Sequence, residues 1–351
     1  MSGHAPITGV ATSVTVFIGS ARSGTSNTPQ QVQSYADFQR HFGGGPMLGD
    51  AVRLFFGDGG QTAWVIRSDK PESALDQLGK MARVNLVCLP GISTPALLKH
   101  ADSVCRQLGA VLIVDPPHGL SPTHVQEWVA DSPIAGSDFT AVYYPWLKVA
   151  DAANPKKVHV VPPSGAVAGV IARTDAAQAV WKAPAGRGAV IAGTAGLETA
   201  VTDVENTALS AGGVNSVRRM PSVGIAVWGA RTLAGADGVQ SDYKYLPVRR
   251  LALFLEASID SGLDWVVFEP NGEDLWQSVQ NTVADFLQGL WQSAAFQGTT
   301  PTDAFIVRCD RTTMTQNDLD NGRLVVQIGF APLHPAEFIL LRITKLTKRG
   351  P

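Results

Sequence analysis

Between residues 74 and 145, short apolar runs alternate with segments of helical periodicity. The runs at residues 85–89, 110–115 and 140–144 consist almost entirely of apolar residues, and the segments at 95–108 and 123–130 carry apolar side chains at helical spacing. Strands buried on both faces are apolar throughout, and helices that connect such strands cover both faces of a parallel sheet. The pattern therefore predicts an α/β layer with a mostly parallel sheet.

Glycine clusters divide the part of the chain that precedes this layer. We predict strands at residues 10–18 and 62–67, with two short helices between them, at 34–42 and 50–56. The Ser34 hydroxyl can accept a first-turn N–H, and Asp37 lies near the positive end of the helix dipole. The glycines at 43–45 and 57–60 follow helices, whereas a phosphate-binding loop follows a strand and opens a helix. We interpret both clusters as helix stops.

The later part of the chain predicts a different, α+β arrangement. Residues 248–259 and 274–291 show helical periodicity, and the second helix has a long apolar stripe and a polar outer face. The apolar run at 265–268 predicts a short strand. Residues 304–343 then predict three strands with turn signals at Asn321-Gly322 and around Pro332 and Pro335. The last strand presents an edge that a strand from another chain can complete, which is the first indication of an assembly protein.

Composition and motifs argue against most other classes of function. The formal net charge of -2 gives no support for nucleic-acid binding. No segment predicts a signal peptide or a membrane span. The three cysteines, Cys88, Cys105 and Cys309, are far apart and are expected to be buried thiols in a protein that folds in the cytosol. The histidine spacings predict no metal site, and no nucleotide-binding motif occurs, so no cofactor is expected.

One arrangement of catalytic residues can be drawn from the sequence. Ser164, His118 and Asp115 each follow a predicted strand, where α/β active sites lie. However, Ser164 lacks the Gly-x-Ser-x-Gly context that exposes a nucleophile, and Asp115 and His118 are close together in sequence. We therefore expect no enzyme and keep a hydrolase that uses Ser164 as the remote alternative.

Motifs along nearly the whole chain resemble one family, the contractile tail sheath proteins of bacteriophages and of phage-tail-like injection systems. The most telling are Val-Trp-Lys-Ala-Pro-Ala-Gly at residues 180–186 and Pro-Ala-Glu-Phe at residues 335–338. The others lie at residues 9–19, 51–60, 141–146, 161–170, 228–233, 248–250 and 268–271.

The resemblance implies a structural part of a contractile machine. Sheath subunits of this family stack as hexameric rings around an inner tube, between a baseplate and a terminator, and are linked by terminal arms that add strands to a neighbour's sheet. The implied donated strand is Phe338, Ile339, Leu340, Leu341, Arg342 and Ile343, and the implied acceptor residues are Phe305, Val307, Leu324, Val326 and Ile328. The helix at 274–291 would face the tube through Gln277, Gln280, Asn281 and Gln288.

The resemblance also implies a domain division and a cellular setting. We expect an N-terminal segment at residues 1–70 that packs with the C-terminal domain, an α/β middle domain at 71–235 and a C-terminal domain at 236–351. The particle would assemble in the bacterial cytoplasm as part of a virion tail or a released injection system. Only eight residues precede the motif that begins at Gly9, whereas the family usually has a longer arm there. A specialised end layer or minor sheath paralogue is therefore kept as an alternative.

Overall fold

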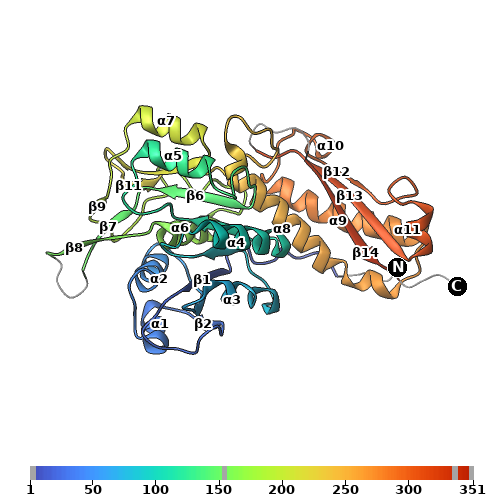
Figure 1. The fold of residues 1–351 in the computed structure, drawn as a ribbon. Coiled ribbons are helices and arrows are strands. Elements are labelled where there is room, and N and C mark those ends of the chain that lie inside the picture. Colours follow the sequence, from blue (N-terminus) through green and yellow to red (C-terminus); the bar gives the residue numbers. More distant parts are fainter. Residues whose placement is uncertain (1–4, 152–155, 334–338, 348–351) are drawn as a thin grey trace. The chain divides into compact units, whose positions relative to one another are not determined.

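The computed structural model describes residues 5–151, 156–333 and 339–347. The chain divides into two compact units (Figure 1). The larger unit is Ala11–Arg250, and the smaller combines Met1–Val10 with Leu251–Pro351. From the sequence we predict residues 1–70 as one segment. In the structure, residues from Ala11 onward belong to the larger unit.

An eight-stranded sheet forms the centre of the larger unit, in the order β11-β10-β6-β5-β4-β1-β3-β2. All neighbouring strands from β10 to β3 are parallel, and only the edge strands β11 and β2 pair antiparallel. The predicted α/β layer is thus confirmed, and the N-terminal strands also belong to its sheet. The strands are β1 (Thr15–Gly19), β2 (Gln30–Val32), β3 (Ala63–Arg67), β4 (Leu86–Cys88), β5 (Val111–Val114), β6 (Thr140–Tyr144), β10 (Val214–Met220) and β11 (Gly224–Val227).

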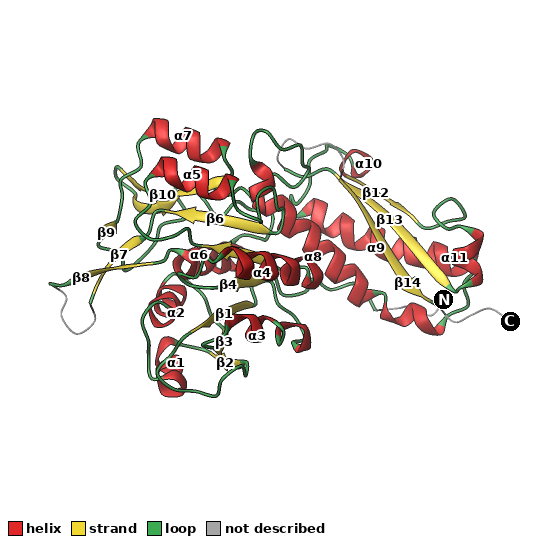
Figure 2. Cartoon of the chain, in the orientation of Figure 1, coloured by secondary structure: helices red, strands yellow, loops and turns green. Residues whose placement is uncertain are grey.

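Helices cover both faces of this sheet (Figure 2). One face packs on α3 (Pro71–Leu75), α4 (Pro95–Leu108), α5 (Pro122–Ala130) and α7 (Asp203–Ala211), whose apolar residues share one core cluster with alternate strand residues. The other face lies against α2 (Leu48–Gly57) and α6 (Ser164–Ala177), where the rings of Phe17 and Phe55 meet edge to face. Burial on both faces explains why the central strands β4, β5 and β6 are almost entirely apolar.

Helix α6 lies unusually close to the backbone of α2. Its first nine residues, from Ser164 to Ala172, are all buried. A Cβ atom at Gly165 would lie 2.2 Å from the Ala51 carbonyl oxygen, and one at Gly169 would lie 2.5 Å from that of Phe55. Only glycine at these two positions permits such a close approach, which is how the small residues that follow Pro162-Pro163 determine the packing.

The remaining elements of the larger unit are short. Ser34 caps α1 (Tyr35–Phe42) by accepting from the Asp37 N–H, as predicted, and Gly43 ends that helix in the left-handed conformation. A second, antiparallel sheet has the order β8-β7-β9. The other elements are β7 (Leu147–Ala150), β8 (Val158–Val161), β9 (Gly196–Leu197), η1 (Leu78–Lys80) and η2 (Leu233–Gly235).

The smaller unit combines helices with an antiparallel sheet of order β12-β13-β14. Helix α8 (Leu246–Gly262) starts in the larger unit and continues into this one. The three predicted strands and the long amphipathic helix are confirmed. The elements are α9 (Glu273–Gln292), α10 (Pro301–Ala304), β12 (Phe305–Arg308), α11 (Gln316–Asp320), β13 (Arg323–Phe330) and β14 (Ile339–Leu346).

The strand predicted at residues 265–268 is wrong. The chain forms a 3₁₀ helix there, η3 (Asp264–Phe268), in which the Val266 N–H donates to the Leu263 carbonyl and the Glu269 N–H to that of Val266. A run of four apolar residues fits either a strand or a turn of helix, because periodicity cannot be read over so short a length.

We predict that Gly165→Ala destabilises the larger unit by about 1–3 kcal/mol, because the new methyl group meets rigid backbone of α2 rather than a movable side chain. Urea unfolding measures the effect. The matched control is Gly57→Ala, whose Cβ would meet no atom within 4 Å and which should keep or slightly raise stability. Equal stability of the two variants would contradict the close packing of α2 and α6.

Candidate functional site

Ser164, Asp115 and His118 do not assemble into a catalytic triad. The Ser164 hydroxyl donates to Asp115 Oδ2 at 2.6 Å, its N–H donates to Oδ1 at 2.8 Å, and both residues are buried. His118 instead pairs with Glu198 at 2.7 Å and its ring lies against Trp146. Among the described residues, Ser164 therefore has a carboxylate but no imidazole beside it, and its hydrogen bonds to Asp115 fix the first turn of α6.

Asp115 is a buried carboxylate that accepts several hydrogen bonds within an apolar core. Its Oδ2 also accepts from the Gly91 N–H at 3.1 Å. Burial raises the pKa of Asp115 to about 6, although the hydrogen bonds from Ser164 and Gly91 favour the charged form. The contact links the loops after β4 and β5 to α6, so its role is structural.

A second buried carboxylate, Asp58, lies at the C-terminal end of α2. Its Oδ1 accepts from the Ala192 N–H at 2.7 Å and lies 3.7 Å from the guanidinium of Arg173. Oδ2 has no hydrogen-bond partner among the described residues. Burial raises the pKa of Asp58 to about 7, although Ala192 and Arg173 oppose the shift. This burial cannot be predicted from the sequence, because Gly-Asp-Gly-Gly is typical of an exposed loop.

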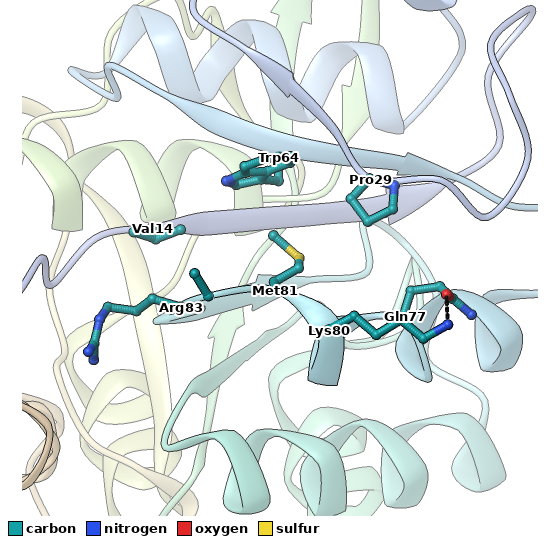
Figure 3. Close-up of a pocket in the computed structure, with 8 residues that line it drawn as sticks. Val14, Pro29, Trp64, Gln77, Lys80, Met81 and Arg83 are labelled. Carbon is teal, nitrogen blue, oxygen red and sulfur yellow. Dashed lines mark hydrogen bonds between the residues drawn. The ribbon is translucent and has the colours of Figure 1, made fainter. Parts of the chain in front are cut away.

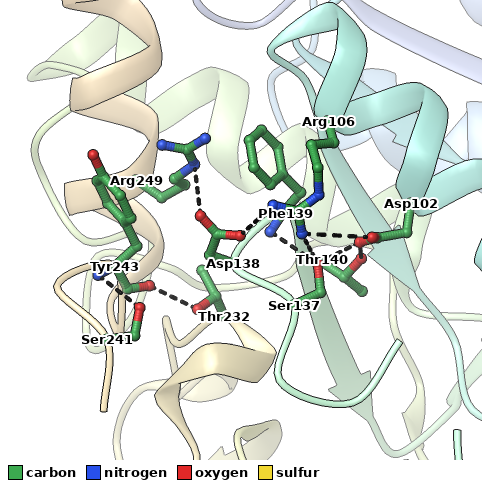
Figure 4. Close-up of polar contacts among 10 residues, drawn as sticks. All are labelled: Asp102, Arg106, Ser137, Asp138, Phe139, Thr140, Thr232, Ser241, Tyr243 and Arg249. Atoms are coloured by element: carbon green, nitrogen blue, oxygen red, sulfur yellow. Dashed lines mark hydrogen bonds and ion pairs between the residues drawn. The ribbon is translucent and has the colours of Figure 1, made fainter. Parts of the chain in front are cut away.

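Two adjacent arginines hold the first turns of α8 within the larger unit. Figure 4 shows the Arg249 guanidinium between the rings of Phe139 and Tyr243, at 3.9 and 4.4 Å from their centroids, and 3.4 Å from Asp138. Arg106 lies 4.4 Å from the centroid of the same Phe139 ring. These contacts combine cation–π attraction with an ion pair at a largely buried side chain.

The second arginine, Arg250, forms a buried bidentate ion pair with Asp175. Its guanidinium donates to both carboxylate oxygens of Asp175, at 2.9 and 2.5 Å, and to the Thr12 carbonyl. Arg250 and Asp175 are almost fully buried. An Arg-Arg pair flanked by apolar residues in the first half of α8 was the available sequence signal for buried ion pairs.

The predicted acceptor residues lie together in one sheet, and their role in accepting a strand stays a prediction. Phe305 and Val307 belong to β12, and Leu324, Val326 and Ile328 belong to β13. The two strands pair antiparallel, with Val307 opposite Ile328. Strands β12 and β14 form the two edges of this sheet.

The predicted donated strand pairs within its own chain. Residues Ile339–Leu346 form β14, which pairs with all eight residues of β13, from Phe330 opposite Ile339 to Arg323 opposite Leu346. Lys345 anchors the strand through ion pairs to Asp260 and Asp264. Phe338 lies outside the described residues. In the single chain the strand completes the chain's own sheet, because β13 offers a matching edge; donation to a second copy stays a prediction.

The polar residues predicted on α9 differ in their surroundings. Gln277 and Asn281 are exposed and hydrogen-bonded to each other at 2.9 Å. Gln280 accepts from the Cys309 N–H at 3.3 Å and so belongs to the packing against the end of β12. Gln288 is half-buried, and Asp285 adds an exposed charge to the outer face. That these residues face a tube stays a prediction.

The described residues offer neither a membrane-spanning helix nor a metal-binding cluster. Across residues 5–151, 156–333 and 339–347, no helix has both the length and the apolar character needed to cross a membrane. Over the same ranges, no three His, Cys, Asp or Glu side chains gather closely enough to hold a metal ion. The three cysteines are free and buried.

Two family models match successive parts of the chain. Residues 68–233 match the phage tail sheath protein central domain, and residues 239–344 match the phage tail sheath C-terminal domain. Identity is 27% over 183 residues with the tail sheath protein of Enterobacteria phage T4 and 26% over 280 residues with that of Vibrio phage KVP40. These matches cover 52% and 79% of this chain but only 26% and 39% of the two relatives.

Solved structures resemble the chain over almost its full length. The sheath complex of the extracellular contractile injection system PVC, in its contracted state, has a TM-score of 0.80 and 29% identity, covering 98% of this chain and 95% of that one. The contracted helical sheath of the anti-feeding prophage has a TM-score of 0.78 and 29% identity, covering 97% and 95%. A sheath tail protein from Listeria innocua shares the fold, with a TM-score of 0.69 at 11% identity over 98% and 97%.

We predict that Asp58→Asn reduces the pH dependence of stability. The pKa of Asp58 is about 7 when folded and 3.8 as an isolated group, so the folded state binds more protons and loses stability as the pH rises from 3.8 through 7. The loss is at most about 4 kcal/mol for such a shift. Urea unfolding across this range should show a flatter profile for the variant. Asp242→Asn, at an exposed site, is the control and should leave the profile unchanged.

Proposed function

The chain belongs to the phage tail sheath protein family, and we propose that it is a structural subunit of a contractile sheath. The observation that carries the proposal is the likeness of the nearly complete chain to subunits of two contracted sheath assemblies. The buried position of Ser164 and its lack of an imidazole partner give no support to the hydrolase alternative. The sheath matches likewise do not favour the end-layer alternative.

We propose that β14 exchanges between copies when the sheath assembles. Its pairing with β13 uses main-chain hydrogen bonds along eight residue pairs, and Ile339, Leu341 and Ile343 are buried against the unit. A strand of identical sequence from another copy makes the same contacts. The exchange therefore replaces contacts within one chain by an equal number of contacts between two chains.

Such a link suits a particle that changes shape. Main-chain pairing acts as a tether that persists, while the surface contacts between subunit bodies are replaced during contraction. The energy for contraction would be stored in the body contacts of the extended sheath. The sheet β12-β13-β14 is thus the tether of the proposed machine, and the larger unit is its rigid body.

The proposal also names partners and a setting. Gln277, Asn281 and Gln288 on α9 are proposed to contact the inner tube, and Gln280 to hold α9 against β12. The other partners are further sheath subunits, a baseplate and a terminator. The particle is a phage tail or a related contractile injection system, assembled in the bacterial cytoplasm.

We predict that the purified full-length chain forms rings or tubes in negative-stain electron microscopy, with the inner tube protein present as template. Assembly is expected because each copy carries both a strand and its acceptor. The chain mixed with an unrelated protein of similar size is the control. Only monomers at high concentration, with and without the tube protein, would contradict the proposed function.

We predict that strand exchange can be detected with the double variant Gln327→Cys/Arg342→Cys. The two positions are opposite each other in the pairing of β13 with β14. Oxidation of assembled particles should give a ladder of covalent multimers on a denaturing gel, because each disulfide then joins two copies. Oxidation of the dilute monomer is the control and should give a closed monomer. Monomers alone from intact particles would show that β14 stays in its own chain.

A further inference from the structure

An apolar groove lies on the surface of the larger unit, beside the strands β1 and β3. Its volume is about 550 Å³. Figure 3 shows Trp64, on β3, on one wall and Met81, in the segment after η1, facing it from the other. Val14 and Pro29 extend the apolar lining, and exposed Ala82 lies at its margin. Trp64 and Met81 are only partly buried, so the groove leaves apolar surface in contact with water.

The charged residues of this groove all have one sign. Lys80 and Arg83 line it, and none of its eight lining residues is acidic. Lys80 donates to Gln77 along the rim, which keeps its ammonium group at the groove. The groove therefore suits an apolar side chain that is flanked by carboxylates.

The smaller unit carries a segment with this chemistry. The Phe268 side chain is 77% exposed and that of Val267 44%, at the end of η3. An aromatic residue of this exposure in a folded unit is a candidate for a contact with a partner. Glu269 follows directly, and Glu273 and Asp274 are exposed in the first turn of α9. Together they form an apolar knob with an acidic rim.

We propose that the Phe268 knob of one copy docks in the Trp64–Met81 groove of a second copy. The apolar tip suits the apolar lining. Glu269 and Glu273 carry the charge opposite to that of Lys80 and Arg83. Charge complementarity of this kind selects a partner and its orientation. The occupant is therefore a second copy of this chain, and not a small molecule or a nucleic acid.

The two patches differ, so the contact is heterologous. A heterologous contact leaves one free knob and one free groove on every pair, and repetition gives a closed ring or an open helical stack. The inference rests on the proposed function, since it specifies a body contact within the same assembly. It is separate from the β13–β14 pairing, because it uses side chains of η3 and of the groove.

Two single-cysteine variants test the contact. Val267→Cys, which keeps Phe268 and lies at a 44% exposed position beside it, and Ala82→Cys are purified separately, with a size tag on one, then mixed, assembled and treated with a short bismaleimide. The native cysteines are buried and should not react. We expect a cross-linked dimer with one copy of each variant, which neither variant gives alone. Val204→Cys, at an 81% exposed apolar site on α7, replaces Val267→Cys in the control and should give no dimer with Ala82→Cys.

Assembly itself provides the second measurement. Phe268→Ser should raise the concentration needed for assembly by about tenfold or more, as expected for an aromatic anchor, whereas Val204→Ser should leave it unchanged. If the wild-type chain forms particles but the mixed variants give no cross-linked dimer, this contact alone is overturned. Failure of the wild-type chain to form any particle would overturn the proposed function, and the contact with it.

Discussion

The close approach of α6 to α2 is the constraint on which the larger unit depends. Gly165 and Gly169 allow the two backbones to touch, so α2 and α6 pack side by side against one face of the parallel sheet. The same packing encloses Asp115 at the start of α6 and Asp58 at the end of α2. Helices in such contact have few alternative arrangements, so the unit is suited to move as one body.

The smaller unit is stabilised in a different way. Its sheet depends on the main-chain pairing of β13 with β14, and its edges are the strands β12 and β14. Main-chain pairing does not depend on which copy supplies the strand. The packing of α6 on α2, in contrast, depends on the absence of a Cβ atom at Gly165 and Gly169. One chain thus combines a part that resists rearrangement with a part that tolerates exchange, and both properties are needed in a contractile sheath.

Most of the fold could be predicted from local sequence. The strands β4, β5 and β6 were recognised because strands buried on both faces are apolar throughout, and Ser34 was recognised as a cap because its hydroxyl can reach only a nearby N–H. The helical turn at η3 was missed, since four apolar residues carry no readable period. The groove at Trp64 and Met81 was also missed, because its walls come from segments that only the fold brings together.

The sheet of the smaller unit shows a different limit of sequence reasoning. The three strands were predicted correctly, but sequence cannot tell whether β14 pairs within a chain or between chains, because the residues and hydrogen bonds are the same in both cases. Buried charges such as Asp58 and Arg250 were not predicted either, because their partners Ala192 and Asp175 are far away in sequence. The tertiary structure, and not the local pattern, determines these contacts.

We propose that this chain is the repeating subunit of a contractile shell and is linked to its neighbours through β14. A cryo-EM reconstruction of the assembled particle, at a resolution that separates strands, tests it most directly. We expect a helical shell in which β14 of each copy pairs with β13 of another copy, and a shell in which each β14 pairs with β13 of its own chain would contradict the proposed link. A shell built from another protein, with this chain absent from the repeat, would contradict it.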